Sequence, residues 1–151
     1  MKPLRLYIHL LLTLLPGCAA EDLPVYRVDN RLEKYVMHFF EEGERHGRKL
    51  DRTNLILSVT PDLLVNEGKT AVTRGTNNGQ IVIEIDDALL SSNDTLFLEF
   101  ALMHEFGHGF LKRGHCTTVS IMNPSRKIVD RYRRSAVERS HLFDELFQAA
   151  D

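Results

Sequence analysis

The histidines and the glutamate between residues 104 and 115 have the types and the spacing of a metal centre. His104, Glu105 and His108 form the pattern H-E-x-x-H, and His115 follows a short distance later. Residues four apart on a helix lie on one face, with Cβ atoms about 5 to 6 Å apart, so the imidazoles of His104 and His108 can bind one ion. The pattern therefore predicts a metal site with a carboxylate beside it.

A zinc ion at this position would support hydrolysis. Hydrolytic zinc centres have three protein ligands and one position for water, whose pKa falls from about 16 to about 7 on the metal. His104 and His108 supply two ligands, and Glu105 is placed to act as the general base that takes the proton from this water. We therefore expect Glu105 to be the catalytic residue and Zn²⁺ to be the cofactor.

Length and composition are those of one globular domain. The chain has 151 residues, 43% of them hydrophobic and 26% charged, with a formal net charge of −2. Proteins that bind nucleic acid usually carry a marked basic excess, so we expect no nucleic-acid partner. Only Cys18 and Cys116 are present, and Cys18 is assigned below to processing, so no disulfide framework is expected. The chain is expected to be a monomer.

The first residues have the pattern of an export signal. Lys2 and Arg5 precede a mostly apolar run over residues 6–15, which is shorter than the about 20 apolar residues that span a bilayer. Residues 15–18, Leu-Pro-Gly-Cys, resemble the lipobox of bacterial lipoproteins, in which cleavage before the cysteine is followed by its lipidation. The resemblance implies lipid attachment at Cys18. Ordinary cleavage after Ala20 is the alternative.

These features divide the chain into a signal peptide over residues 1–17, a tether over residues 18–26 and a folded domain over residues 27–151. Lipidation would attach the domain stably to a membrane. By the same resemblance, Ala19 after the lipidated cysteine favours the bacterial outer membrane. Without lipidation the exported domain would be periplasmic or secreted.

Hydrophobic periodicity predicts an α/β (α+β) fold that carries the site on a helix. Apolar residues recur at helical spacing in three segments and alternate, or are β-branched, in others. Helices are predicted over residues 27–46 (capped by Asp29 or Asn30), from the cap residues 91–94 through His104, and over residues 130–150; strands are predicted over residues 55–60, 70–73 and 80–86. We expect a small domain with an N-terminal helix, a short mixed sheet, the site helix and a C-terminal helix.

The site residues resemble those of the metzincin clan of zinc peptidases, whose pattern is H-E-x-x-H-x-x-G-x-x-H with a downstream Met-turn. His104, Glu105 and His108 match the first half, and residues 120–124, Ser-Ile-Met-Asn-Pro, resemble the Met-turn. The resemblance implies that His115 is the third ligand and that Met122 forms an apolar floor beneath the ligands. It also implies a metalloendopeptidase that hydrolyses peptides or proteins.

The chain departs from the clan pattern just before the third histidine. Leu111 occupies the position of the clan's glycine, and His115 lies one residue later than the clan's third histidine. Gly114 is predicted to end the helix with a positive φ. The alternative third ligand is an acidic residue of the last helix, as in gluzincins, with Glu138 favoured over Glu145.

In metzincin-like folds the edge strand before the site helix pairs with an extended peptide, and the resemblance assigns this role to Gln80–Asp86. The other residues that can bind metal, Cys116, His38, His46 and His141, are predicted to be structural or surface residues. Two further functions fit the same motifs. One is a zinc-binding structural or interaction lipoprotein, which would not need Glu105, and the other is a metal hydrolase acting on cell-wall peptides.

Overall fold

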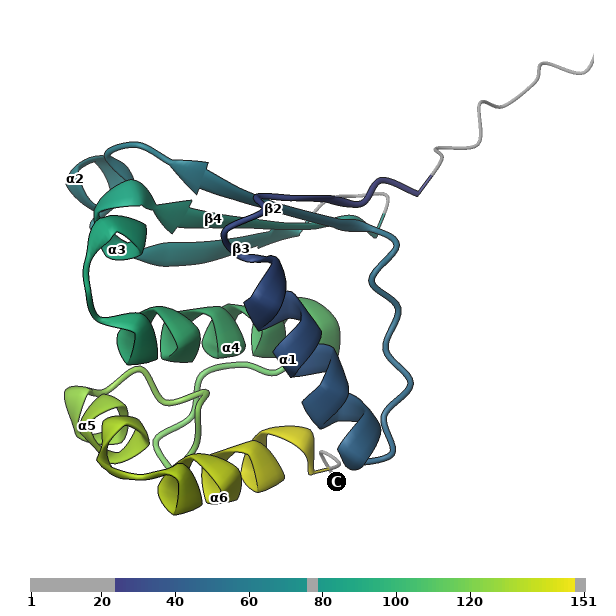
Figure 1. Ribbon diagram of the computed structural model, residues 1–151, viewed down its shortest axis with the longest axis vertical. Helices are drawn as coiled ribbons and strands as arrows, with labels where there is room; N and C mark the ends of the chain where they lie inside the picture. The colour runs from purple at the N-terminus through teal and green to yellow at the C-terminus, as the bar shows by residue number, and fades with distance from the viewer. Residues whose placement is uncertain (1–23, 76–78, 149–151) are drawn as a thin grey trace, which may run out of the picture.

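A mixed sheet covers the helix that carries the histidines (Figure 1). In the described part of the chain its strand order is β1, β2, β4, β3, with β1, β2 and β4 parallel and β3 antiparallel to β4. The strands are β1 (Arg27–Val28), β2 (Leu55–Thr60), β3 (Ala71–Gly75) and β4 (Ile81–Asp86). This computed structural model describes residues 24–75 and 79–148. The predicted signal peptide and Cys18 lie outside the described residues.

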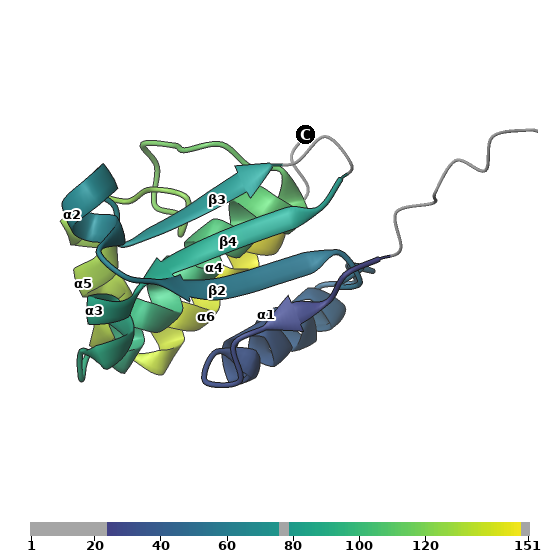
Figure 2. The same ribbon diagram turned by 90° about the horizontal axis from the view of Figure 1, so that it is seen from above.

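The longest helix lies between the sheet and two other helices. The described helices are α1 (Glu33–Arg45), α2 (Leu63–Glu67), α3 (Asp87–Ser91), α4 (Thr95–Leu111), α5 (Arg126–Arg134) and α6 (Ala136–Phe147). In Figures 1 and 2, α1 and α4 lie on one face of the sheet, and α5 and α6 lie on the far side of α4. The α/β prediction is confirmed. No helix among the described residues is long and apolar enough to cross a membrane.

The buried strands follow the alternation seen in the sequence. Ile83 and Ile85 of β4 are completely buried, as are Leu55 and, to within 1% exposure, Leu57 of β2. The predicted strands over residues 55–60 and 80–86 are confirmed, the second as β4. The short predicted strand at residues 70–73 is β3, which extends to Gly75.

The prediction that residues 80–86 form the edge strand is wrong. β4 is paired with β2 on one side and with β3 on the other, so it lies inside the sheet. β3 is the outer strand beside α4 (Figure 2). Alternating apolar residues indicate burial of one face of a strand, which is equally true of edge and inner strands. The order of the strands depends instead on pairing between distant segments.

The first helix begins later than predicted, and Asp29 is not its cap. Arg27 and Val28 pair with β2 as β1. The carboxylate of Asp29 accepts a hydrogen bond from the backbone N–H of Arg31 at 3.0 Å. It also forms an ion pair with the guanidinium of Arg31, at 2.6 Å. Asp29 therefore closes a turn between strand and helix, and Leu32 precedes the first residue of α1 without a side-chain cap.

The predicted C-terminal helix is two helices. Ser135 has an extended backbone (φ −161°, ψ 162°), which ends α5 and begins α6. Its hydroxyl accepts the backbone N–H of Glu138 at 3.2 Å, as an N-cap does. α5 in turn starts earlier than predicted, at Arg126. Serine is tolerated inside helices, so the apolar periodicity alone did not reveal the break.

Aromatic rings join three helices on the side of α4 away from the histidines. The ring of Phe39 in α1 lies 5.1 Å from that of Phe106 in α4 and 5.1 Å from that of Phe147 in α6. Phe39 and Phe106 are completely buried. Burial of such a side chain contributes roughly 1.5 to 3 kcal/mol, so this cluster holds the site helix firmly.

His38 of α1 contacts Glu99 of α4 and Glu42 of its own helix. Its Nδ1 lies 2.8 Å from Glu99 Oε1, and its Nε2 lies 3.4 Å from Glu42 Oε1. Both ring nitrogens face acceptors, which favours the imidazolium with its two N–H groups. The hydrogen bond to Glu99 is the main reason why the pKa of His38 lies above its ordinary value, although burial acts in the opposite direction.

We expect His38 to stabilise the fold at mildly acidic pH. A pKa that is raised in the folded state gives a stabilisation that is complete below the unfolded pKa, about 6.5, and is lost as the pH rises through the folded pKa. The loss of unfolding free energy in His38→Gln should therefore be larger at about pH 5.5 than at about pH 9. Urea unfolding of the metal-free proteins measures this difference, with the exposed His141→Gln as control. A difference that does not vary with pH would contradict the assignment.

Candidate metal centre

The helix α4 presents His104, Glu105 and His108 from its middle turns. Asp94 caps the helix, because its carboxylate accepts the backbone N–H of Phe97 at 3.0 Å. This is one of the cap residues predicted from the sequence. His104 and Glu105 are only 7% and 8% exposed. Their side chains are thus held by packing before any ion binds.

His115 lies beside the two helical histidines. Its Nε2 is 3.0 Å from His104 Nε2, which is 3.1 Å from His108 Nε2. Nitrogens bound to one zinc at about 2.0 to 2.1 Å in tetrahedral directions would lie about 3.3 Å apart. The ligand atoms of the three residues all fall within 4.8 Å of one another, so this group can hold a metal ion. Within the described residues, no other three His, Cys, Asp or Glu side chains form such a group.

Backbone carbonyls orient two of the three imidazoles. His104 Nδ1 lies 2.8 Å from the carbonyl oxygen of Ile121, and His108 Nδ1 lies 2.6 Å from that of Arg113. A carbonyl can only accept, so each Nδ1 carries the hydrogen and each Nε2 keeps its lone pair for a metal. Burial lowers the pKa of His104 below its ordinary value. Neutral imidazoles of this kind fit zinc, which favours nitrogen ligands.

Lys112, and not Gly114, makes the turn after the helix. Lys112 ends α4 in the left-handed conformation (φ 55°, ψ 29°), and Gly114 does not have a positive φ, so the prediction for Gly114 is wrong. The clan pattern has its third histidine three positions after its glycine. His115 is likewise three positions after Lys112. Relative to that pattern, both the turn residue and the third histidine of this chain lie one residue later.

We expect Lys112→Gly to stabilise the chain. A left-handed conformation costs a non-glycine residue roughly 1 to 2 kcal/mol, and glycine avoids this cost. Glycine also has more conformational entropy in the unfolded chain, which offsets roughly 0.5 to 1 kcal/mol of the stabilisation. The free energy of unfolding should therefore rise by about 0.5 to 1 kcal/mol. Thermal unfolding of the metal-free protein measures it. Lys112→Ala, which keeps the strain, is the control, and an equal effect of both substitutions would rule out strain at this turn.

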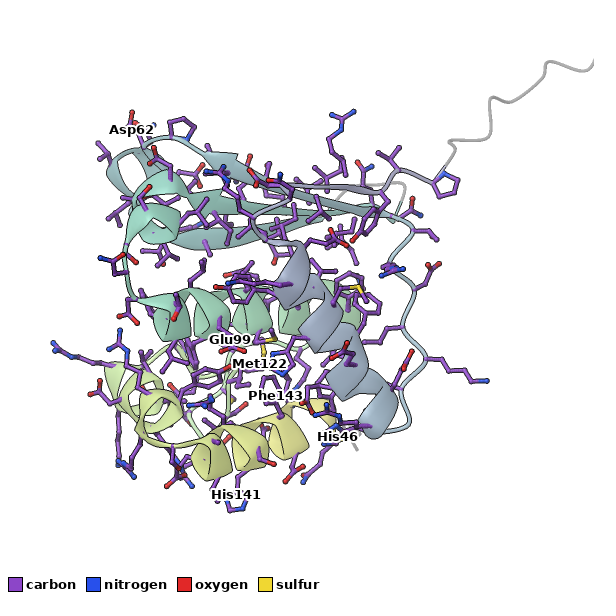
Figure 3. The ribbon with its side chains drawn as sticks, viewed as in Figure 1. His46, Asp62, Glu99, Met122, His141 and Phe143 are labelled. Carbon is purple, nitrogen blue, oxygen red and sulfur yellow. The ribbon has the colours of Figure 1, made fainter. Side chains whose placement is uncertain are left out.

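Met122 lies beneath the helix turn that carries the ligands. It is completely buried, and a Cβ added to Gly107 would lie 2.4 Å from its sulfur. Gly107, without a side chain, leaves the room on α4 that the Met122 side chain fills. Figure 3 shows Met122 between α4 and α6. The backbone N–H of Cys116 donates to the carbonyl of Met122 at 3.2 Å, which ties this loop to the segment containing His115.

The alternative ligands have other partners. Glu138 pairs with Arg131 and lies 3.3 Å from Arg134, and its hydrogen bond to Arg131 lowers its pKa. Glu145 accepts from Arg113 Nη2 at 2.6 Å. Neither belongs to the histidine group, so the structure does not bring an acidic residue of the last helix to the site.

Two further residues also lie apart from the histidine group. The sulfur of Cys116 accepts a hydrogen bond from the hydroxyl of Thr118 at 3.4 Å. His141 points away from α4 in Figure 3. The structure therefore gives Cys116 a hydrogen-bonding role and leaves His141 on the surface, as the sequence predicted.

A cleft of about 610 Å³ lies between β3 and α4 and opens onto the histidines. One end is lined by Phe97, Phe100 and Val129, and the other by Gly109 and Lys112. Thr73 of β3 also lines it, and its Oγ1 lies 2.7 Å from Glu105 Oε2. Thr73 belongs to no motif and lies 32 residues from Glu105, so the sequence did not predict its place in the site.

Comparison with known proteins assigns no family to the chain. A scan against protein-family models, a search of curated proteins and a search of solved structures each find no match. The geometry alone describes the site. It consists of three histidine nitrogens that can hold a metal, with a buried carboxylate beside them in the lining of the cleft. A carboxylate next to a group that can hold a metal is an arrangement that hydrolytic metal sites use.

Proposed function

We propose that the chain is a zinc-dependent peptidase with Glu105 as its general base. The observation that carries the proposal is the convergence of the three Nε2 atoms next to Glu105 in the cleft. Zinc held there would polarise a substrate carbonyl and make water acidic enough to lose a proton near neutral pH. Glu105, directly after the ligand His104, accepts that proton and later passes it to the leaving amine.

The number of ligands favours catalysis over a structural role. Structural zinc sites are closed by four protein ligands, whereas catalytic sites have three and keep one position open. His104, His108 and His115 are three, and among the described residues no fourth metal-binding side chain joins the group. The open position would face the cleft, where a substrate can reach it. This supports an enzyme over the alternative of a zinc-binding lipoprotein without turnover.

The edge of β3 supports an extended peptide as the substrate. In the described part of the chain, β3 pairs with β4 on one side and has no strand partner on the other. Its backbone N–H and C=O groups can therefore pair with a peptide laid along the cleft, by β-augmentation. The peptide would therefore pair with β3, which is the edge strand, and not with β4, which lies inside the sheet. A peptide bound along β3 would pass next to the three histidines, which line the same cleft.

The apolar end of the cleft supports a preference for an apolar side chain next to the cleaved bond. Phe100 stacks on His104 with ring centroids 6.3 Å apart, and Phe97 and Val129 line the cleft near it. An apolar side chain buried against these residues gains roughly 25 cal/mol for each Å² removed from water. Peptides with leucine or phenylalanine beside the cleaved bond are the first substrates to test.

Export and lipid attachment at Cys18 belong to the same proposal and are supported by the sequence. The outer membrane is the proposed location if the lipid is attached, and the periplasm or the medium if cleavage follows Ala20. The substrate would then be a peptide or protein outside the cytoplasm. Cell-wall peptides are included in this class, so peptidoglycan fragments should be tested beside ordinary peptides.

The test compares zinc-loaded, metal-free and reloaded protein on a proteome-derived peptide library and on peptidoglycan fragments. Mass spectrometry identifies the new ends. The proposal expects cleavage by the zinc-loaded protein, loss of cleavage after chelation and recovery with one equivalent of zinc. Protein that holds one zinc per chain and cleaves none of these substrates would contradict it.

A further inference from the structure

Thr73 contacts the carboxylate of Glu105 from the strand on the opposite side of the cleft. Its Oγ1 lies 2.7 Å from Glu105 Oε2 and 2.9 Å from the backbone oxygen of Glu105. An ionised carboxylate and a carbonyl can only accept, so the single hydroxyl hydrogen of Thr73 is the donor. The shorter contact has the length of a charge-assisted O–H···O bond, which is the stronger kind.

The packing of the sheet on α4 makes this contact possible. Residues alternate along β3, and the side chain of Thr73 faces α4, whereas the side chain of Arg74 pairs with Glu84 and Glu67. A Cβ added to Gly109 of α4 would lie 2.7 Å from Ile81 Cγ2 and 3.7 Å from Thr73 Cγ2. The first distance is too short for a real contact, so glycine at this position lets Ile81 of β4 pack closely on α4, and the second is an ordinary van der Waals contact with β3. This packing of the sheet on α4 leaves β3 close enough for the Thr73 hydroxyl to reach Glu105.

We infer that Thr73 is a positioning residue, whose hydroxyl holds the Glu105 carboxylate in the orientation needed for proton transfer. This inference rests on the proposed function. Glu105 is 8% exposed, and among the staggered rotamers open to its side chain the hydrogen bond to Thr73 favours the one that brings the carboxylate to β3. The hydrogen bond to Oε2 leaves Oε1 outside that contact and free for a proton. Catalytic groups that are displaced by about 1 Å lose about 100-fold in rate, so the orientation matters for turnover.

The same strand would bind the substrate and orient the base. Thr73 lies in the middle of β3, whose free edge is the proposed docking site for the peptide backbone. The side chain of Thr73 faces Glu105, while its backbone belongs to that edge. A substrate paired with β3 would therefore be fixed relative to the base through one residue. This makes Thr73 a connection between substrate binding and proton transfer.

The test uses two substitutions at Thr73 and one matched control. Thr73→Val removes the hydroxyl and keeps the shape, Thr73→Ser keeps the hydroxyl, and Thr60→Val makes the same change at a half-buried threonine of β2 that does not line the cleft. On a peptide cleaved by the wild type, we expect Thr73→Val to lower kcat by about 10-fold to 100-fold with KM within about twofold. Thr73→Ser should recover most of kcat, and Thr60→Val should retain it. Zinc affinity should be unchanged in all three.

A second measurement does not depend on turnover. Acetohydroxamic acid binds zinc and needs an acceptor for its proton beside the metal, so its affinity for the zinc-loaded protein reports the position of Glu105. Calorimetry should show about tenfold weaker binding to Thr73→Val and unchanged binding to Thr73→Ser and Thr60→Val.

These outcomes separate the inference from the proposed function. If the wild type cleaves no peptide but Thr73→Val still weakens hydroxamate binding, the peptidase proposal fails and the role of Thr73 holds. If Thr73→Val matches the wild type in kcat and in hydroxamate binding, or if serine does not restore them, the inference is overturned while the peptidase proposal holds. Wild-type protein that neither cleaves a peptide nor binds the hydroxamate would overturn both.

Discussion

Glu105→Gln is expected to abolish most peptide hydrolysis while the protein still holds one zinc per chain. An amide can hydrogen-bond to water but cannot take its proton, and a positioned general base contributes about 100-fold to 10,000-fold to a rate. We expect kcat to fall by a factor in this range. Zinc affinity should change little, because the proposed ligands are the three histidines. Steady-state kinetics on a library-derived peptide and metal analysis of the same sample measure both quantities.

The matched control for this substitution is Glu41→Gln, which makes the same chemical change at an exposed residue of α1. It should leave kcat and zinc content at their wild-type values. If Glu105→Gln cleaves peptides as fast as the wild type, Glu105 is not the base. The hydrolysis would then come from another group or from a contaminating protease. If Glu105→Gln loses its zinc, the carboxylate has a role in binding the metal that the present assignment does not include.

His115→Ala is expected to have the largest effect on the metal. It removes one of three ligands, and loss even of a residue that only orients a ligand costs about 10-fold to 100-fold in affinity. We expect the zinc Kd to rise by more than about 100-fold. His115 is exposed, so the substitution should leave the thermal unfolding of the metal-free protein close to that of the wild type. Competition with a chromophoric chelator measures the Kd.

Two controls test the choice of ligand. His141→Ala removes an exposed histidine of α6 that lies apart from the group, and Glu138→Gln removes the charge of the alternative third ligand. Both should keep wild-type zinc affinity. A variant without His115 that still binds zinc tightly, together with loss of binding in Glu138→Gln, would show that the alternative was the correct assignment.

Features that depend on neighbouring residues were predictable from the sequence. The spacing of His104 and His108 places them on one face of a helix whatever surrounds it, and the cap at Asp94 needs only the next three residues. The strands β2 and β4 likewise follow from local β-branched and alternating patterns. The α/β class follows from these elements together.

Features that depend on contacts between distant segments were not predictable. The order of the strands, which puts β3 at the edge, is decided by pairing of β4 with both β2 and β3. The left-handed turn at Lys112 is a strained conformation that only the surrounding structure can impose, whereas a sequence pattern favours glycine there. The contact between Thr73 and Glu105 joins residues that share no motif.

The crystal structure of the zinc-loaded protein with a peptide hydroxamate bound is the most direct test of the proposed function. The proposal predicts one ion bonded to Nε2 of His104, His108 and His115, with the hydroxamate on its remaining positions and Glu105 against it. The peptide should lie antiparallel or parallel to the edge of β3, with backbone hydrogen bonds to Ala71–Gly75. An ion bound without His115, or a peptide bound away from β3, would contradict the account.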